Sequence, residues 1–200
     1  MKTELKQDLL AASPTTFFGA SLYCDPALIA IEQTRLFKRT WLYIGDTASL
    51  FASGNVLVQE VAGTSLVFVR DPRGRLQAFY NVCPHRASLL CSQAGNHQLA
   101  HLVCPYHGWV YSLQGELLGA PREERFPEGF RPQDFPLVAV RVEEWQGFAF
   151  VCFCPEAPPL LDYLGSIPTN LAQYRTLKTT LLVQKAYTVH CNWKVYHDNT

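Results

Sequence analysis

The sequence has no excess of charge of either sign, because 17 lysines and arginines are balanced by 17 aspartates and glutamates and no basic run occurs. Proteins that bind nucleic acid usually carry a basic face, so the balance argues against such a partner. Long apolar runs are also missing. The N-terminus offers only Leu9–Ala12, with Glu4 and Asp8 before it and Pro14 after it. This run is too short for a signal peptide or a membrane span, and we expect no membrane association.

Internal repeats, low-complexity tracts and a regular cysteine framework are absent from the sequence as well. Seven cysteines form an odd, unevenly spaced set. That pattern is typical of a reducing compartment, so the predicted location is the cytoplasm. What the sequence does have is 48% hydrophobic residues among 200, enough for a substantial core in one or two domains.

Four side chains that can bind metal form a motif with two similar halves. Cys83 and His85 form a C-x-H half, and Cys104 and His107 form a C-x2-H half after an 18-residue gap. Two thiolates and two neutral imidazoles match a Rieske iron-sulfur centre, in which two histidines replace two cysteines on one iron. Neutral nitrogen in place of negative sulfur makes such a cluster easier to reduce. The sequence therefore predicts electron transfer.

Zinc is the alternative occupant, because it also binds sets of two cysteines and two histidines. Zinc modules usually pair their ligands as C-x2-4-C and H-x3-5-H, whereas each half here supplies one cysteine and one histidine. We expect Pro84 and Pro105 to stiffen the two loops, and Gly108 to let the backbone pass close to the cluster. The aromatic rings of Tyr106, Trp109 and Tyr111 are expected to shield it from water.

Short β-rich segments dominate from Trp41 onward, and the ligand loops are expected at the tips of a small antiparallel sheet. Residues 71–74 have the composition of a hairpin turn, and residues 143–147 are expected to join the last two strands. The strands are predicted at residues 55–61, 65–70, 76–80, 137–142 and 148–153.

The remaining segments are predicted to be helices, a loop and one further strand. Pro26 opens a predicted helix over residues 27–38, in which Leu28, Ile31 and Leu36 suggest an apolar face. Residues 121–136 are predicted to form a loop, with charged side chains on the surface. Residues 155–159 mark a domain border, followed by a short helix and a strand over residues 181–189. The charged residues of the loop are Arg122, Glu123, Glu124 and Arg125.

The stretch from Asn81 to Tyr111 resembles the Rieske domain of ring-hydroxylating and related Rieske non-haem iron oxygenases, in their large (alpha) subunit. The segment Cys191–Lys194, followed by Asp198 and Asn199, is similar to the one that opens the catalytic iron-binding helix in that family. Its form is similar to the branch of choline monooxygenase-like enzymes. The resemblance implies a mainly β Rieske domain, with small antiparallel sheets and two cluster-binding loops, plus the start of an α+β catalytic domain.

By this resemblance the chain divides into an N-terminal helical arm (1–40), the Rieske domain (41–155) and the start of the catalytic domain (156–200). The expected function is the electron-accepting portion of an oxygenase that hydroxylates an organic substrate with O2. Electrons come from NAD(P)H through a reductase or ferredoxin, and the full-length enzyme is expected to be a homotrimer. A stand-alone Rieske ferredoxin is the alternative. The implied cofactors are a [2Fe-2S] cluster and, in the full-length protein, a mononuclear Fe(II).

The resemblance also assigns places to individual residues. The expected cluster ligands are Cys83, His85, Cys104 and His107, with Arg86, Tyr106 and Trp109 near the cluster and Asn199 near the iron. The family's iron-binding histidines follow this point, so the sequence resembles a truncated portion with no catalytic residue of its own. His190, His197 and Asp198 are not expected to form a substitute site, because neighbouring helical residues point about 100° apart.

Respiratory Rieske proteins carry two further cysteines that form a disulfide, and Ser88 and Tyr106 occupy those positions here. Without that disulfide the expected reduction potential lies near the low end of the Rieske range, about −150 mV. Cys91 is expected to be a buried, reduced thiol. His97 is predicted to lie in a turn, and His101 to open the strand that leads into Cys104.

Overall fold

The structure, a computed structural model, describes residues 19–51, 54–174, 183 and 185–198. The chain forms two compact units, one over Phe37–Thr180 and one that combines Met1–Leu36 with Leu181–Thr200. Within the described ranges, no helix is long and apolar enough to cross a membrane.

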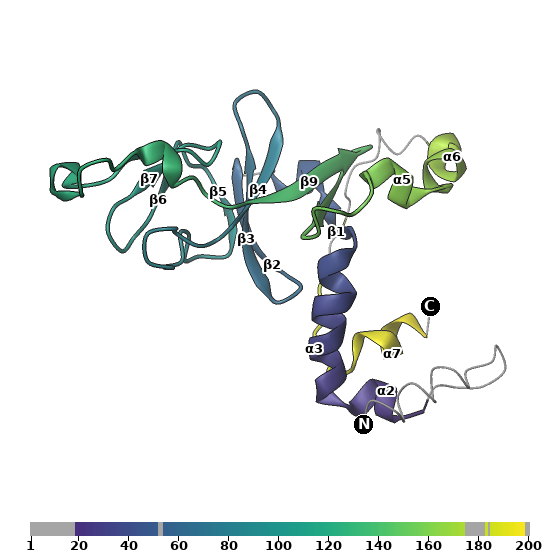
Figure 1. Cartoon of the computed structure of the whole chain (residues 1–200). Helices are drawn as coiled ribbons and strands as arrows, with labels where there is room; N and C mark the ends of the chain where they lie inside the picture. The colour runs from purple at the N-terminus through teal and green to yellow at the C-terminus, as the bar shows by residue number, and fades with distance from the viewer. Residues whose placement is uncertain (1–18, 52–53, 175–182, 184, 199–200) are drawn as a thin grey trace. The chain divides into compact units, whose positions relative to one another are not determined.

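The unit Phe37–Thr180 is built on two antiparallel sheets (Figure 1). The larger sheet has seven strands in the order β1-β10-β9-β4-β3-β2-β5, and the smaller has the order β6-β7-β8. The prediction of a mainly β fold is thereby confirmed. The strands are β1 (Leu42–Asp46), β2 (Val56–Val61), β3 (Thr64–Arg70), β4 (Leu76–Tyr80), β5 (Gly95–His97), β6 (Leu102–Val103), β7 (Val110–Tyr111), β8 (Leu117–Gly119), β9 (Ala139–Trp145) and β10 (Phe148–Cys152).

Hydrophobic clusters cover both faces of the larger sheet. In β3, Val67 and Val69 belong to one cluster and Leu66 and Phe68 to the other, as the alternation of side chains along a strand requires. All four side chains are fully buried. The cluster that holds Val67 and Val69 also contains Cys83 and Cys104, so the core of this unit extends into the two ligand loops.

Tight turns set the register of the hairpins. The β3–β4 turn is organised by Asp71, whose Oδ1 accepts hydrogen bonds from the backbone N–H groups of Arg73 and Arg75, both at 2.9 Å. The β9–β10 turn consists of Gln146 and Gly147, both at positive φ. Hairpin turns of two residues take this conformation because it matches the twist of the strands. The predicted link over residues 143–147 was therefore too long, since β9 continues to Trp145.

The segment between β8 and β9 has no strand but contains two short 3-10 helices, η2 (Glu123–Arg125) and η3 (Pro132–Asp134). The side chains of Arg122, Glu124 and Arg125 are exposed, as predicted. Beyond β10, the predicted short helix is present and a second one follows it. These two helices are α5 (Leu160–Leu164) and α6 (Ile167–Leu171), and the 3-10 helix η4 (Ala172–Tyr174) comes after them. Near the start of the unit lie the 3-10 helix η1 (Phe37–Arg39) and the helix α4 (Thr47–Leu50).

The other unit contains three helices within its described residues: α2 (Ser21–Cys24), α3 (Pro26–Arg35) and α7 (Trp193–His197). Asp25 caps α3 by accepting from the N–H of Ala27 at 2.9 Å, and Pro26 occupies the first helical position.

Two predictions for this unit were wrong in part. The α-helix predicted over residues 27–38 ends at Arg35, and residues 37–39 form the separate 3-10 helix η1. Of its expected apolar face only Leu28 is buried, whereas Ile31 and Leu36 are 44% and 43% exposed. In the segment predicted as a strand over residues 181–189, the described residues 183 and 185–189 have no regular structure.

Candidate metal centre

The first ligand loop follows β4 and is closed by backbone hydrogen bonds at Cys83. The Cys83 N–H donates to the carbonyl of Ser88 at 2.8 Å, and the Cys83 carbonyl accepts from the N–H of Ala87 at 3.0 Å. Ala87 is left-handed, with φ 55°. This conformation costs a residue other than glycine roughly 1–2 kcal/mol, so the surrounding contacts must hold the turn. Pro84 and His85 lie within it.

The second loop, between β6 and β7, repeats the same arrangement at Cys104. Its N–H donates to the carbonyl of Trp109 at 2.8 Å, and its carbonyl accepts from the N–H of Gly108 at 2.9 Å. Gly108 holds the position of Ala87 and has φ 73°. An added Cβ at Gly108 would lie 3.1 Å from Cγ of Pro121. The two halves of the motif are therefore the same turn, although the histidine comes two residues after one cysteine and three after the other.

Both thiols of the motif lie in the hydrophobic interior, with Cys83 1% exposed and Cys104 2% exposed. The pKa of the Cys83 thiol is raised, mainly by burial. A hydrogen bond with Tyr111 lowers this pKa, whereas the nearby Cys104 raises it further. Iron binds the thiolate, so metal binding here must displace protons. The apolar surroundings then keep water away from the sulfur atoms.

The two imidazoles are closer to the surface and face one another. The rings of His85 and His107 have centroids 4.7 Å apart and both residues are half-buried. Burial, followed by the charges of His107 and Arg86, lowers the pKa of His85 and keeps its ring neutral. Its Nδ1 atom is buried without a hydrogen-bond partner in the described structure. A neutral ring with a free buried nitrogen fits a metal ligand.

The donor set as a whole suits two metal positions better than one. The two thiols are buried in the interior, whereas the two imidazoles lie together nearer the surface, so the donors form one sulfur pair and one nitrogen pair. A structural zinc site requires four protein ligands at one point. A [2Fe-2S] cluster of Rieske type takes two cysteines on one iron and two histidines on the other. The side chains present therefore fit the cluster.

The residues expected beside the donor set differ in exposure. Trp109 and Tyr111 are buried, whereas Tyr106 is 60% exposed and lies over His107 with ring centroids 3.8 Å apart. The hydroxyl of Tyr111 lies 3.3 Å from Sγ of Cys83. Arg86 is exposed, and its charge acts on His85.

Asn81 was missed by the sequence reasoning, although it organises the first loop. It is 1% exposed, and its Oδ1 accepts from the N–H groups of Leu90 and Cys91 at 3.1 and 2.8 Å. Its Nδ2 donates to Ser65 Oγ at 3.0 Å and to the Cys91 carbonyl at 2.8 Å. Asparagine is common in turns, so nothing in the residue type signalled a fully bonded interior position.

Two other expectations near the loops need correction. His97 lies in the short strand β5 rather than in a turn, and its Nε2 is 3.0 Å from the carbonyl of Gln93. Cys91 is a free thiol as predicted, but it is only half-buried because it packs at the edge of the core. His101 is exposed and directly precedes β6.

The segment Cys191–Lys194, which resembles the opening of the iron-binding helix, is hydrogen-bonded to α3. Glu32 accepts hydrogen bonds from Trp193 Nε1 at 2.8 Å and from Lys194 Nζ at 2.5 Å. The hydroxyl of Tyr23 donates to Asp198 Oδ2 at 2.6 Å. The side chains of Trp193 and Lys194 therefore both donate to a single carboxylate, that of Glu32 in α3.

The histidines of this unit show no arrangement for iron. His190, His197 and Asp198 are exposed and do not converge with one another as a three-ligand group within the described residues. Asn199, the residue expected near the catalytic iron, lies outside the described residues.

Residues 40–155 match the family described as the Rieske [2Fe-2S] domain. The chain therefore belongs to the Rieske [2Fe-2S] domain family. A domain of this family carries a [2Fe-2S] cluster, so the predicted cofactor is confirmed. The family match covers both ligand loops and all ten strands described above.

The chain is similar to oxygenase components. It is 35% identical over 177 residues to the glycine betaine monooxygenase oxygenase subunit of Chromohalobacter salexigens, covering 88% of this chain and 39% of that protein. It is 30% identical over 177 residues to the biphenyl 2,3-dioxygenase subunit alpha of Rhodococcus jostii, covering 86% and 38%. The apo structure of the quaternary ammonium Rieske monooxygenase CntA gives a TM-score of 0.81 at 30% identity, covering 92% and 53%. The resemblance to Rieske oxygenases is thereby confirmed.

The chain covers only part of each of these relatives. It spans about two fifths of the length of the two curated relatives and about half of the solved structure.

Proposed function

We propose that this chain is the electron-input part of a Rieske oxygenase, with its cluster held by Cys83, His85, Cys104 and His107. The observation that carries the proposal is the repeated turn, which brings two buried thiols and two half-buried imidazoles together at one end of the hydrophobic core. The cluster, when bound, supplies the transfer of single electrons.

The protein around it has four tasks. Apolar packing keeps water from the cysteine sulfurs, and the hydroxyl of Tyr111 stabilises negative charge on Cys83. The repeated backbone hydrogen bonds fix the positions of both cysteines. The half-buried rings of His85 and His107 leave the imidazole side nearest the surface, where an electron-transfer partner can approach.

For the longer protein we propose that residues 41–155 receive the electron and that residues 156–200, with the N-terminal arm 1–40, begin a catalytic domain with a mononuclear Fe(II). Its partners are a reductase or ferredoxin that carries electrons from NAD(P)H, O2 and a small organic substrate. A homotrimer in the cytoplasm, without nucleic-acid or membrane partners, completes the proposal. The contacts of Glu32 with Trp193 and Lys194 support this reading of the arm, because they join it to the segment that resembles the iron-binding helix.

A quaternary ammonium compound is the substrate class we favour for the longer protein. Two of the similar proteins are named for such compounds, glycine betaine in one and quaternary ammonium substrates in the other. The similarity to a biphenyl dioxygenase makes an aromatic ring the alternative. Turnover assays of the longer protein with glycine betaine and with biphenyl separate the two classes.

A stand-alone ferredoxin-type carrier is the second candidate. The residues after β10 distinguish it, because an electron carrier has no need of α5, α6 and the Asn-Trp-Lys segment at α7. The extent of the similarity to oxygenase subunits, over 86% to 92% of this chain, favours the oxygenase.

Metal analysis tests the proposal. The purified chain is expected to contain two iron atoms and two labile sulfides per polypeptide, with a red-brown colour. One zinc ion per chain without sulfide would instead identify a zinc-stabilised module.

A further inference from the structure

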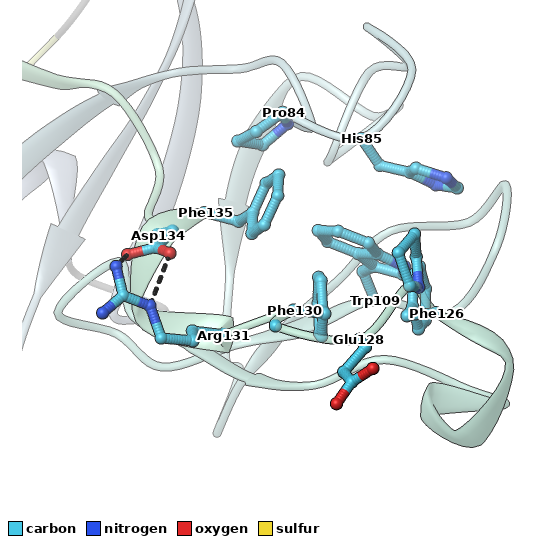
Figure 2. Close-up of a pocket in the computed structure, with 11 residues that line it drawn as sticks. Pro84, His85, Trp109, Phe126, Glu128, Phe130, Arg131, Asp134 and Phe135 are labelled. Carbon is cyan, nitrogen blue, oxygen red and sulfur yellow. Dashed lines mark hydrogen bonds and ion pairs between the residues drawn. The ribbon is translucent and has the colours of Figure 1, made fainter.

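The indole of Trp109 and the imidazole of His85 are stacked face to face (Figure 2). Their ring centroids are 4.6 Å apart and their planes differ by 2°. Trp109 is only 2% exposed. Such a contact restricts rotation of the smaller ring, because any tilt of the imidazole drives its edge into the indole.

The indole itself is held by three phenylalanines, here called the phenylalanine trio: Phe126, Phe130 and Phe135. Each presents a steep angle to Trp109, with centroids 5.9, 6.1 and 5.7 Å away and interplanar angles of 72°, 68° and 89°. Phe130 also stacks on both of its companions. Edge-to-face contacts of this kind are favourable and directional. A segment without strands thus supports a ring that rests on His85.

An open cavity of about 440 Å³ borders this stack (Figure 2). Its lining includes Pro84, His85, Trp109 and the phenylalanine trio. Free space next to a side chain allows it to change rotamer, so the imidazole and the indole are not confined by solid packing on every side. The ring contacts with Trp109 and His107 therefore restrain the ring of His85 on the sides that the cavity leaves closed.

We propose that Trp109 is a positioning residue for the cluster: it fixes the plane of the His85 imidazole, and the phenylalanine trio fixes Trp109. The proposal rests on the proposed function, in which His85 is a cluster ligand. Residues that orient a metal-bound histidine set how its nitrogen meets the metal and how firmly the metal is held. Loss of the stack should therefore change the nitrogen coupling of the reduced cluster and hasten its loss.

The test compares Trp109→Phe with Trp109→Leu in the purified, cluster-loaded chain. The readouts are the ¹⁴N hyperfine couplings in pulsed EPR and the rate of cluster loss, followed by visible absorbance in the presence of a chelator. Phenylalanine can still stack, so Trp109→Phe is expected to stay near the wild type in both. Trp109→Leu is expected to alter the couplings and to lose the cluster about two- to tenfold faster, as the strength of one aromatic pair implies.

Trp145→Phe is the matched control, because Trp145 packs in a separate hydrophobic cluster around Trp41 and Cys152. Unchanged couplings in this control support a specific role for Trp109. Equal changes in Trp145→Phe and Trp109→Leu would overturn it, since the effect would then follow from general loosening of the fold.

Phe130→Leu covers the case in which Trp109→Leu does not fold, because it loosens the indole and leaves the His85 contact in place. It is expected to shift the couplings in the same direction by a smaller amount. Wild-type couplings and cluster lifetime in every foldable variant would overturn the positioning role while the proposed function stands. A wild-type chain without any Rieske signal would instead overturn the proposed function itself.

Discussion

The hydroxyl of Tyr111 lies 3.3 Å from Sγ of Cys83, and both side chains are buried in the hydrophobic core that extends into the ligand loops. With a metal-bound thiolate as the acceptor, the hydroxyl must be the donor. The bond stabilises negative charge on sulfur, and reduction adds negative charge to the cluster. With the cluster bound, this contact is therefore expected to raise the reduction potential above the value that the loops alone would give.

Tyr111→Phe is expected to lower the midpoint potential by about 20–60 mV, the one-electron equivalent of a single hydrogen bond of typical net strength. Potentiometric titration followed by EPR or visible absorbance measures it. Tyr106→Phe is the control, because Tyr106 is 60% exposed, and its potential should stay at the wild-type value. An unchanged or higher potential in Tyr111→Phe would show that the hydroxyl does not donate to the ligand.

Asn81→Ala should destabilise the folded chain strongly. Its removal leaves the buried N–H groups of Leu90 and Cys91 and the Cys91 carbonyl without their partner. We expect a loss of about 2–4 kcal/mol in the free energy of unfolding, measured by denaturant titration. Gln77→Ala on β4 is the control, because its amide makes a single 3.3 Å bond to Leu113. Equal effects of the two substitutions would refute a special role for Asn81.

Glu32→Ala should loosen α7, because Trp193 Nε1 and Lys194 Nζ both donate to this carboxylate. A hydrogen bond to a charged group contributes about 1.5 kcal/mol to stability. Its loss therefore predicts roughly tenfold faster hydrogen exchange of the α7 amides. Exchange detected by mass spectrometry or NMR reports it. Glu60→Gln, on an exposed position of β2, serves as the control. Unaltered exchange in Glu32→Ala would mean that α7 is held by other contacts.

Asp71 should contribute to stability in a pH-dependent way. The pKa of Asp71 is lowered, mainly by the hydrogen bond from the backbone of Arg75. Burial acts in the opposite direction, whereas hydrogen bonds from the Arg75 side chain and the Arg73 backbone lower the pKa further. Because the folded pKa lies below the unfolded one, the contribution is complete above the unfolded pKa and disappears as pH falls through the folded pKa.

Asp71→Asn should accordingly be less stable than the wild type at pH 7, and the difference should shrink below about pH 4. Thermal unfolding between pH 2.5 and 7 measures the two curves. Asp162→Asn, at an exposed position of α5, should leave the pH dependence unchanged. A constant difference across this range would exclude ionisation of Asp71 as its cause.

The sequence predicted those features that depend on residue type and local spacing. The strand at residues 76–80 matches β4, and those at 55–61 and 65–70 differ from β2 and β3 by one residue at their first position, because their apolar residues are dense and bounded by turn residues. The four metal-ligand side chains were conspicuous because cysteine and histidine recur with the same neighbours.

Features that depend on tertiary packing could not be predicted in the same way. The hydrogen-bond partners of Asn81 lie 9 to 16 positions away along the chain, and the ring partners of the phenylalanine trio lie 4 to 26 positions away. No local period marks such contacts. The helix predicted over residues 27–38 was too long because its apolar residues continue past Arg35, whereas the α-helix ends there and residues 37–39 form the 3-10 helix η1.

EPR of the reduced chain shows whether the two cysteines and two histidines of the repeated turns bind a Rieske cluster. We expect the low average g-value of a cluster with mixed nitrogen and sulfur ligation, with ¹⁴N couplings from two imidazoles. Replacement of His107 by cysteine should remove one nitrogen coupling or the whole signal. A reduced wild-type chain with no such signal, or with the same ¹⁴N couplings after His107→Cys, would contradict this ligand assignment.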